Sequence, residues 1–211
     1  AFDYYKIKIG SQFENIFFQK LFNKVQEGMV IYDIGGSIGM YTIPFAKKVG
    51  KTGKVFVFEP TNKGIESIKQ NLTINNIDNV VAYPYAISDN TSEANFYVRP
   101  DKETHSLFEK TTAPSKTDEQ KTIKVKVFTI DDLIEKNLSL PPNFIKIDTE
   151  GAEIKVLDGI NKTYDSLDLI FVEIHKPALK LENIFNPEIV IEKKLKKIGF
   201  PKFEYLSGAH L

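Results

Sequence analysis

Residues 30–39 read Val30-Ile31-Tyr32-Asp33-Ile34-Gly35-Gly36-Ser37-Ile38-Gly39. The apolar start predicts a buried strand, the glycines predict a tight turn, and a helical pattern follows over residues 38–48. Glycine tolerates positive φ and lets a ligand approach the backbone closely. Ligands of open α/β sheets bind at the carboxyl ends of strands. The stretch therefore predicts a ligand pocket at this turn; the alternative is that the glycines only make the turn.

The alternation of strand and helix patterns continues along the chain. Further helical patterns cover 62–72, 132–136, 151–157 and 187–198, and further strand patterns cover 55–58, 80–85, 144–147, 169–174 and 203–206. Asn62 is the expected N-cap of the 62–72 helix. Such alternation predicts an α/β fold: a mostly parallel sheet with right-handed crossovers and helices on both faces.

The length of 211 residues fits a single domain, 1–211, with two additions. Residues 1–28 form an N-terminal helical segment, in which Ser11 is a candidate cap. Its phenylalanines suggest a buried lid or a homodimer surface: Phe13, Phe17, Phe18 and Phe22. Residues 90–128 form an insertion, with strand patterns at 94–98 and 122–129. The polar residues 99–121 between them are either a substrate lid or a disordered connection.

Composition excludes several kinds of site. Lys+Arg and Asp+Glu both number 28, so the net charge is +0, which argues against a nucleic-acid partner. Cysteine is absent, which excludes disulfides, thiolate metal sites and a Cys nucleophile. No stretch is long and apolar enough for a membrane span, and no leader pattern is present. A cytoplasmic location with no membrane partner is the default expectation.

The glycine loop does not match the dinucleotide fingerprint Gly-x-Gly-x-x-Gly. Counted from Gly35, the second and third glycine positions hold Ser37 and Met40; counted from Gly36, they hold Ile38 and Tyr41. A missing fingerprint disfavours an NAD-dependent oxidoreductase, which stays open only as an alternative.

Two acids instead indicate a nucleoside without a pyrophosphate. Asp33 lies at the end of the first strand, where a carboxylate would repel a pyrophosphate and suit a cationic ligand. Glu59 follows it by 26 residues (59 − 33), at the end of the second strand, where acids typically bind ribose hydroxyls. A ribose with a cationic remainder describes S-adenosylmethionine (SAM).

Further acids follow the strand at 144–147. Asp148 and Glu150 are expected on the same rim as Asp33, where they could orient a substrate, hold a metal or act as a base. The alternative is that Glu150 and Glu153 only decorate a helix N-terminus, and for Glu153 we expect that role. Glu173 and His175 share one face after the last parallel strand. His175 is either a general base or a hydrogen-bonded structural histidine. His105 and His210 are expected to be bystanders.

Six motifs together resemble the FkbM-type methyltransferases. They lie at 33–42, 58–60, 86–89, 129–133, 145–153 and 172–175, in the family's order, and the block Ile145-Lys146-Ile147-Asp148-Thr149-Glu150-Gly151-Ala152-Glu153 is the most specific. The resemblance implies a Rossmann-like class I methyltransferase fold. It also implies SAM-dependent O-methylation of a small-molecule acceptor, often a sugar or natural-product hydroxyl.

The resemblance also implies roles for individual residues. Asp33, Gly35, Ser37 and Gly39 would line the methionine end of SAM, while Glu59 would hold the ribose. Gly36 and Asp148 are further candidate cofactor-binding residues. Ala86 and Ile87 would flank the adenine, although the acid often found there in class I enzymes is replaced by Tyr85-Ala86. N-methylation and a non-catalytic SAM-binding module remain alternatives.

The predicted chemistry is deprotonation of an acceptor hydroxyl. Candidate catalytic residues are His175, as the favoured base, with Asp148 and Glu150. A divalent metal held by Asp148 and Glu173 is an alternative, although the sequence gives no complete ligand set.

Overall fold

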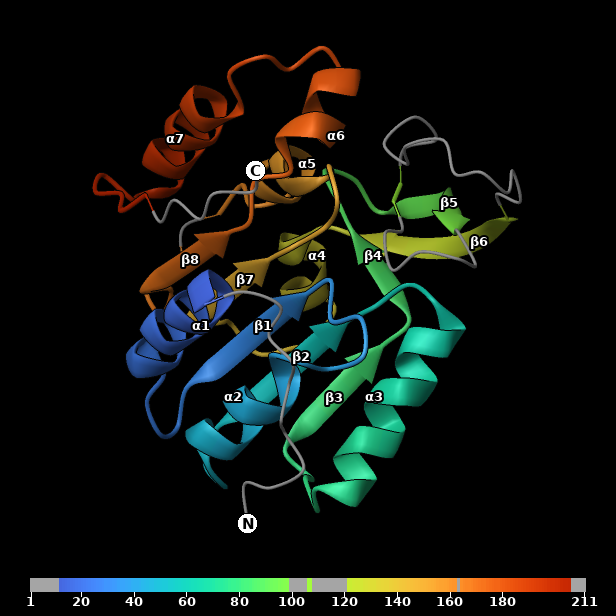
Figure 1. Cartoon of the computed structure of the whole chain (residues 1–211), viewed down its shortest axis with the longest axis vertical. Helices are drawn as coiled ribbons and strands as arrows, with labels where there is room; N and C mark the ends of the chain where they lie inside the picture. Colours follow the sequence, from blue (N-terminus) through green and yellow to red (C-terminus); the bar gives the residue numbers. More distant parts are fainter. Residues whose placement is uncertain (1–11, 99–105, 108–120, 163, 206–211) are drawn as a thin grey trace.

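The computed structural model describes residues 12–98, 106–107, 121–162 and 164–205. Its main sheet has five parallel strands in the order β3-β2-β1-β7-β8. Their bounds are β1 Val30–Ile34, β2 Lys54–Phe58, β3 Val80–Tyr83, β7 Phe144–Ile147 and β8 Leu169–Val172. The order reverses at β1, which is the kind of switch point where such sheets bind ligands. The predicted Rossmann-like fold is confirmed (Figure 1).

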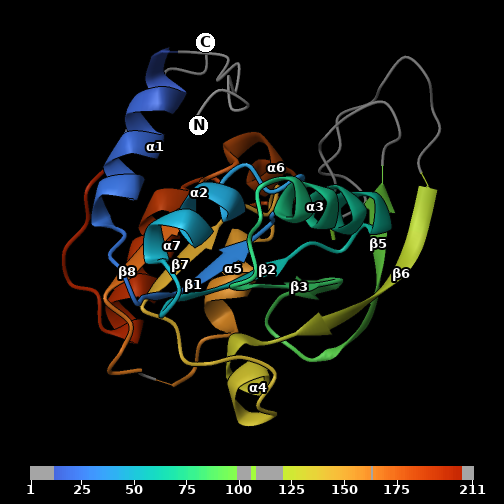
Figure 2. The ribbon, with the colours of Figure 1, turned by 90° about the horizontal axis from the view of Figure 1, so that it is seen from below.

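Helices cover both faces of this sheet, as predicted. Figure 2 shows α2 and α3 on one face and α4 on the other. The helix bounds are α1 Gln12–Lys24, α2 Thr42–Val49, α3 Asn62–Ile74, α4 Ile130–Glu135, α5 Glu153–Asp158, α6 Lys176–Leu181 and α7 Pro187–Ile198.

The two faces bury separate clusters because successive strand side chains point to opposite sides. From β1, Tyr32 and Ile34 pack into the larger cluster, which takes apolar residues of α4, α5, α6 and α7. Ile31 packs into the second cluster, with residues of α1 and α2. Every strand residue of β7 is buried, so the carboxyl end of β7 is held firmly by the core.

A second sheet holds the predicted insertion, with one correction. It has three strands rather than a pair, in the order β4-β6-β5: β4 Tyr85–Ile87, β5 Ser92–Val98 and β6 Lys121–Phe128. β5 and β6 are antiparallel as expected, but β4 also joins β6, in parallel. The predicted single strand 80–85 therefore breaks at Pro84, which has no N–H to donate to a continuous ladder.

Several predicted boundaries were wrong. The helix after the glycine loop begins at Thr42 rather than Ile38, because the loop continues through a turn to Tyr41. Thr61, not Asn62, caps α3: its hydroxyl accepts a hydrogen bond from Gly64 N at 3.1 Å. β8 ends at Val172, and residues 203–205 form no strand. The short helix α6 was not predicted.

Some predictions concern residues outside those described. They include the Ser11 cap, His105, His210 and most of the 99–121 segment. Within α1, Phe18 stacks on Phe22 with ring centroids 5.6 Å apart and also contacts Tyr41. The homodimer stays a prediction. Among the described residues, no helix is long and apolar enough to span a membrane.

Candidate active site

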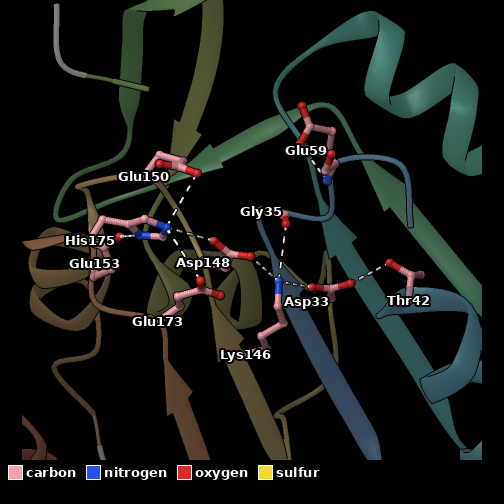
Figure 3. Close-up of polar contacts among 11 residues, drawn as sticks. Asp33, Gly35, Thr42, Glu59, Lys146, Asp148, Glu150, Glu153, Glu173 and His175 are labelled. Carbon is pink, nitrogen blue, oxygen red and sulfur yellow. Dashed lines mark hydrogen bonds and ion pairs between the residues drawn. The ribbon is translucent and has the colours of Figure 1, made fainter. Parts of the chain in front are cut away.

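The carboxyl ends of four parallel strands lie side by side. Strand pairing places Ile34 beside Phe58 and Ile147, and Ile147 beside Val172. The side chains at or just after these ends therefore share one edge of the sheet. Predicted site residues lie together along this edge in Figure 3: Asp33, Gly35, Glu59, Asp148, Glu150 and His175. Glu153 and Glu173 lie beside them.

The glycine loop fits tightly between β2 and β7. Gly35 has φ +83°, and a Cβ added there would lie 1.7 Å from the carbonyl oxygen of Asp148. A Cβ at Gly36 would lie 2.1 Å from Cγ2 of Val57. Both amides donate to the carbonyl oxygen of Phe58, at 3.0 and 3.2 Å. The glycines are therefore required for close approach of three chain segments, and the loop backbone is held in place.

Glu59 joins this loop to the start of α3. Its Oε2 accepts a hydrogen bond from Ser37 N at 3.0 Å, and its Oε1 accepts bonds from the Thr61 amide and hydroxyl at 2.9 and 2.6 Å. The side chain is buried, and this burial raises the pKa of Glu59 above its ordinary value. A carboxylate fixed in this way beside the glycine loop can accept hydrogen bonds from ribose hydroxyls.

Lys146 connects the two acidic motifs and was missed as a site residue. Its ammonium lies 3.2 Å from Oδ1 of Asp33 and 3.1 Å from Oδ2 of Asp148, and 4.6 Å from the centroid of the Tyr41 ring. Thr42 donates a hydrogen bond of 2.6 Å to the other Asp33 oxygen. Asp33 is fully buried with both oxygens engaged, so its predicted contact with the cofactor stays a prediction.

The charge of Lys146 is fixed by its neighbours. Burial alone would lower the pKa of Lys146, but the charges of Asp148 and Asp33 outweigh burial and raise the pKa well above its usual value. The sequence carried a signal for this role: Lys146 interrupts an otherwise apolar strand whose residues are all buried. A charge in such a position needs a partner.

His175 lies among four carboxylates. Its Nδ1 is 2.6 Å from Oε1 of Glu153. Its Nε2 faces three other carboxylates, at 3.7 Å from Asp148, 3.5 Å from Glu150 and 3.9 Å from Glu173. Glu153 does begin a helix as expected, but it is no surface decoration, because it is fully buried.

This acidic surrounding controls protonation of the ring. Burial alone would lower the pKa of His175, but the hydrogen bond with Glu153 and the charge of Glu150 raise it from 6.5 to about 9. Burial likewise raises the pKa of Glu150. The free protein therefore holds His175 mainly as an imidazolium at neutral pH.

A metal ion has a partial set of ligands here. Asp148, Glu173 and His175 each offer one ligand atom, and these atoms lie within 4.8 Å of one another. Two carboxylates and one imidazole suit a divalent cation. A proton held on the ring competes with any metal for Nε2, because a ligating histidine must be neutral.

Ala86 and Ile87, predicted to flank the adenine, lie in β4 of the second sheet. The side chains of Ala86 and Ile87 are buried in hydrophobic clusters, so their predicted place beside an adenine stays a prediction. From the predicted lid, Ser106 is described: it is buried, bridges to Tyr97 of β5, and donates a hydrogen bond of 3.1 Å to the Glu150 carbonyl oxygen. The insertion therefore adjoins the acidic rim.

The donor set fits SAM. The rim offers the carboxylates of Asp148, Glu150 and Glu173, which suit a cationic ligand. Glu59 offers acceptors for ribose hydroxyls at the end of the neighbouring strand.

Comparison with known proteins places methyltransferases among those similar to this chain. The chain is 26% identical over 157 residues to "Hexuronic acid methyltransferase AglP" of Haloferax volcanii, covering 74% of this chain and 59% of that protein. It is 26% identical over 186 residues to "Methyltransferase 1" of Beauveria bassiana, covering 80% and 74%. A solved structure of precorrin-6y C5,15-methyltransferase from Geobacter metallireducens has a TM-score of 0.48 at 14% identity, covering 85% and 69%.

The family assignment rests on a match over most of the chain. The model of the methyltransferase FkbM domain matches residues 33–200, which include the glycine loop, the Lys146 block and His175. The chain therefore belongs to the FkbM methyltransferase family.

Proposed function

We propose that this protein transfers a methyl group from SAM to a hydroxyl group of a sugar or similar small molecule. The observation that carries the proposal is one shared edge of the sheet, which holds the glycine loop, Glu59 and His175 (Figure 3). Lys146 joins the two halves of this edge, because it pairs with Asp33 and with Asp148. The presence of Glu59 and His175 on one edge supports a site that holds a ribose and deprotonates an acceptor. The name of the AglP relative supports a sugar acceptor.

The chain's own groups supply alignment and proton transfer. When bound, SAM supplies a methyl group whose bond to sulfur breaks as the acceptor oxygen attacks. The glycine loop and Glu59 would hold the nucleoside of SAM and fix its position beside the acceptor hydroxyl. His175 Nε2 takes the hydroxyl proton, and the carboxylates of Asp148 and Glu150 stabilise the resulting imidazolium.

Titration calorimetry with SAM, S-adenosylhomocysteine and NAD tests the cofactor. We expect heat of binding with the first two and none with NAD. Incubation with SAM carrying a labelled methyl group and a panel of methyl hexosides then tests transfer. Binding without transfer to any sugar, amine or natural-product acceptor would favour the non-catalytic module. Binding of NAD alone would favour the oxidoreductase.

The pH dependence tests His175 as the base. With a pKa of about 9, roughly one ring in a hundred is neutral at pH 7. Because only the neutral ring accepts a proton, we expect kcat/KM to rise about tenfold per pH unit between pH 6 and 8 and to level off above about pH 9. Assays in EDTA separate this mechanism from the metal alternative. Loss of turnover in EDTA, restored by Mg²⁺, would show that a metal ion and not His175 activates the hydroxyl.

A further inference from the structure

Glu153 is a buried carboxylate whose hydrogen bonds are incomplete. It is fully buried at the first position of α5, and its Oε1 accepts a hydrogen bond from Gly151 N at 2.9 Å besides contacting His175. Its Oε2 is buried and has no hydrogen-bond partner among the described residues. A buried carboxylate with one unsatisfied oxygen destabilises a fold. Stability alone therefore gives no reason for a glutamate here.

The backbone before α5 turns this carboxylate toward the ring. Glu150 and Gly151 both adopt left-handed conformations, with φ +53° and +109°. For Glu150 this conformation is costly, because its Cβ crowds the backbone. The turn directs the Gly151 N–H at the Glu153 carboxylate and keeps Oε1 within reach of His175 Nδ1.

The ring of His175 does not cap the helix that follows it. His175 is the N-cap residue of α6, yet its side chain makes no capping hydrogen bond. Its Nδ1 is taken by Glu153, which leaves Nε2 toward Asp148, Glu150 and Glu173 (Figure 3). A histidine whose one nitrogen donates to a carboxylate has a fixed tautomer and ring orientation.

We propose that Glu153 is the positioning residue of the methyl-transfer site: it holds the proton on Nδ1 of His175 and aims Nε2 at the acceptor hydroxyl. Glu153 touches neither substrate nor cofactor in this scheme and acts through His175. The inference rests on the proposed function insofar as His175 is the base. The contact between the two side chains can be tested without turnover.

The kinetic test uses Glu153→Gln, which keeps the shape of the side chain and removes its charge. Glu66→Gln is the matched control, because Glu66 is an exposed glutamate on α3. With labelled SAM and a methyl hexoside as probe, we expect Glu153→Gln to lower kcat roughly 100-fold and leave the KM for SAM within about threefold. The control leaves both unchanged.

A double variant shows whether Glu153 acts through the ring. In a His175→Gln background, Glu153→Gln should lower kcat no further, because the group that it positions is already gone. Glu153→Asp should also be slow, because it keeps the charge but withdraws it from Nδ1. An additive loss in the double variant, or full activity of Glu153→Gln, would overturn the proposal.

An NMR measurement separates this proposal from the proposed function. In protein saturated with S-adenosylhomocysteine, we expect a protected ring N–H resonance of His175, absent in His175→Gln and also lost in Glu153→Gln. If the wild-type protein methylates no acceptor but shows this pattern, the positioning contact stands and the proposed activity fails. If Glu153→Gln unfolds, the resonance in Glu153→Asp decides. An unchanged resonance in both variants would refute the positioning role.

Discussion

Replacing Lys146 with methionine is expected to destabilise the folded chain by about 3–5 kcal/mol, because it leaves the buried Asp33 carboxylate without its cation. Lys146 itself is 1% exposed and lies between Asp33 and Asp148. Methionine retains most of the side-chain volume, so the loss reports on charge rather than on a cavity. Urea unfolding followed by circular dichroism measures the effect.

Two further variants make this prediction specific. Lys69→Met removes an exposed lysine of α3 and should change the free energy of unfolding by less than about 0.5 kcal/mol. Asp33→Asn in the Lys146→Met background should restore part of the stability, because it neutralises the unpaired charge. If Lys146→Met alone were as stable as the wild-type chain, the ion pairs seen here would not hold the two motifs together.

Replacing His175 with glutamine is expected to lower kcat between about 10²- and 10⁴-fold, the range that a positioned general base typically contributes. Glutamine keeps a polar side chain of similar length but cannot take up the proton. Binding of SAM should stay close to that of the wild type, since in the proposed mechanism His175 contacts the acceptor hydroxyl and not SAM. Calorimetry with SAM and turnover with labelled methyl groups measure the two effects separately.

The residual activity carries the decisive information. If His175 is the base, the rise of turnover with pH should vanish in His175→Gln. If turnover is unchanged, another group removes the proton, and Asp148 or Glu173 would be tested next. A large loss of SAM binding would instead give His175 a structural place in the cofactor pocket.

The sequence alone predicted the parallel α/β sheet and most of its helices. The strand, glycine turn and helix at 30–49 and the acids after each strand depend on local patterns: short apolar runs, glycines and helical periodicity. Because parallel strands end at one edge of a sheet, the gathering of Asp33, Glu59, Asp148 and His175 followed from the predicted parallel direction of the strands. Predicted element boundaries were wrong where neighbouring residues could serve equally well, as for the N-cap Thr61 beside Asn62, and where the strand breaks at Pro84.

The tertiary structure decided how these residues interact. The sequence did not predict that Lys146, in an apolar strand, lies between carboxylates from two different motifs, nor that Glu153 turns inward to hold His175. The contacts of Lys146 with Asp33 and of Glu153 with His175 join residues 113 and 22 positions apart (146 − 33 and 175 − 153). The carboxylates around the ring outweigh its burial and raise the pKa of His175. The sequence does not distinguish a helix carboxylate or a strand lysine that faces water from one that faces a buried partner. Only packing removes the water and makes the pairing obligatory.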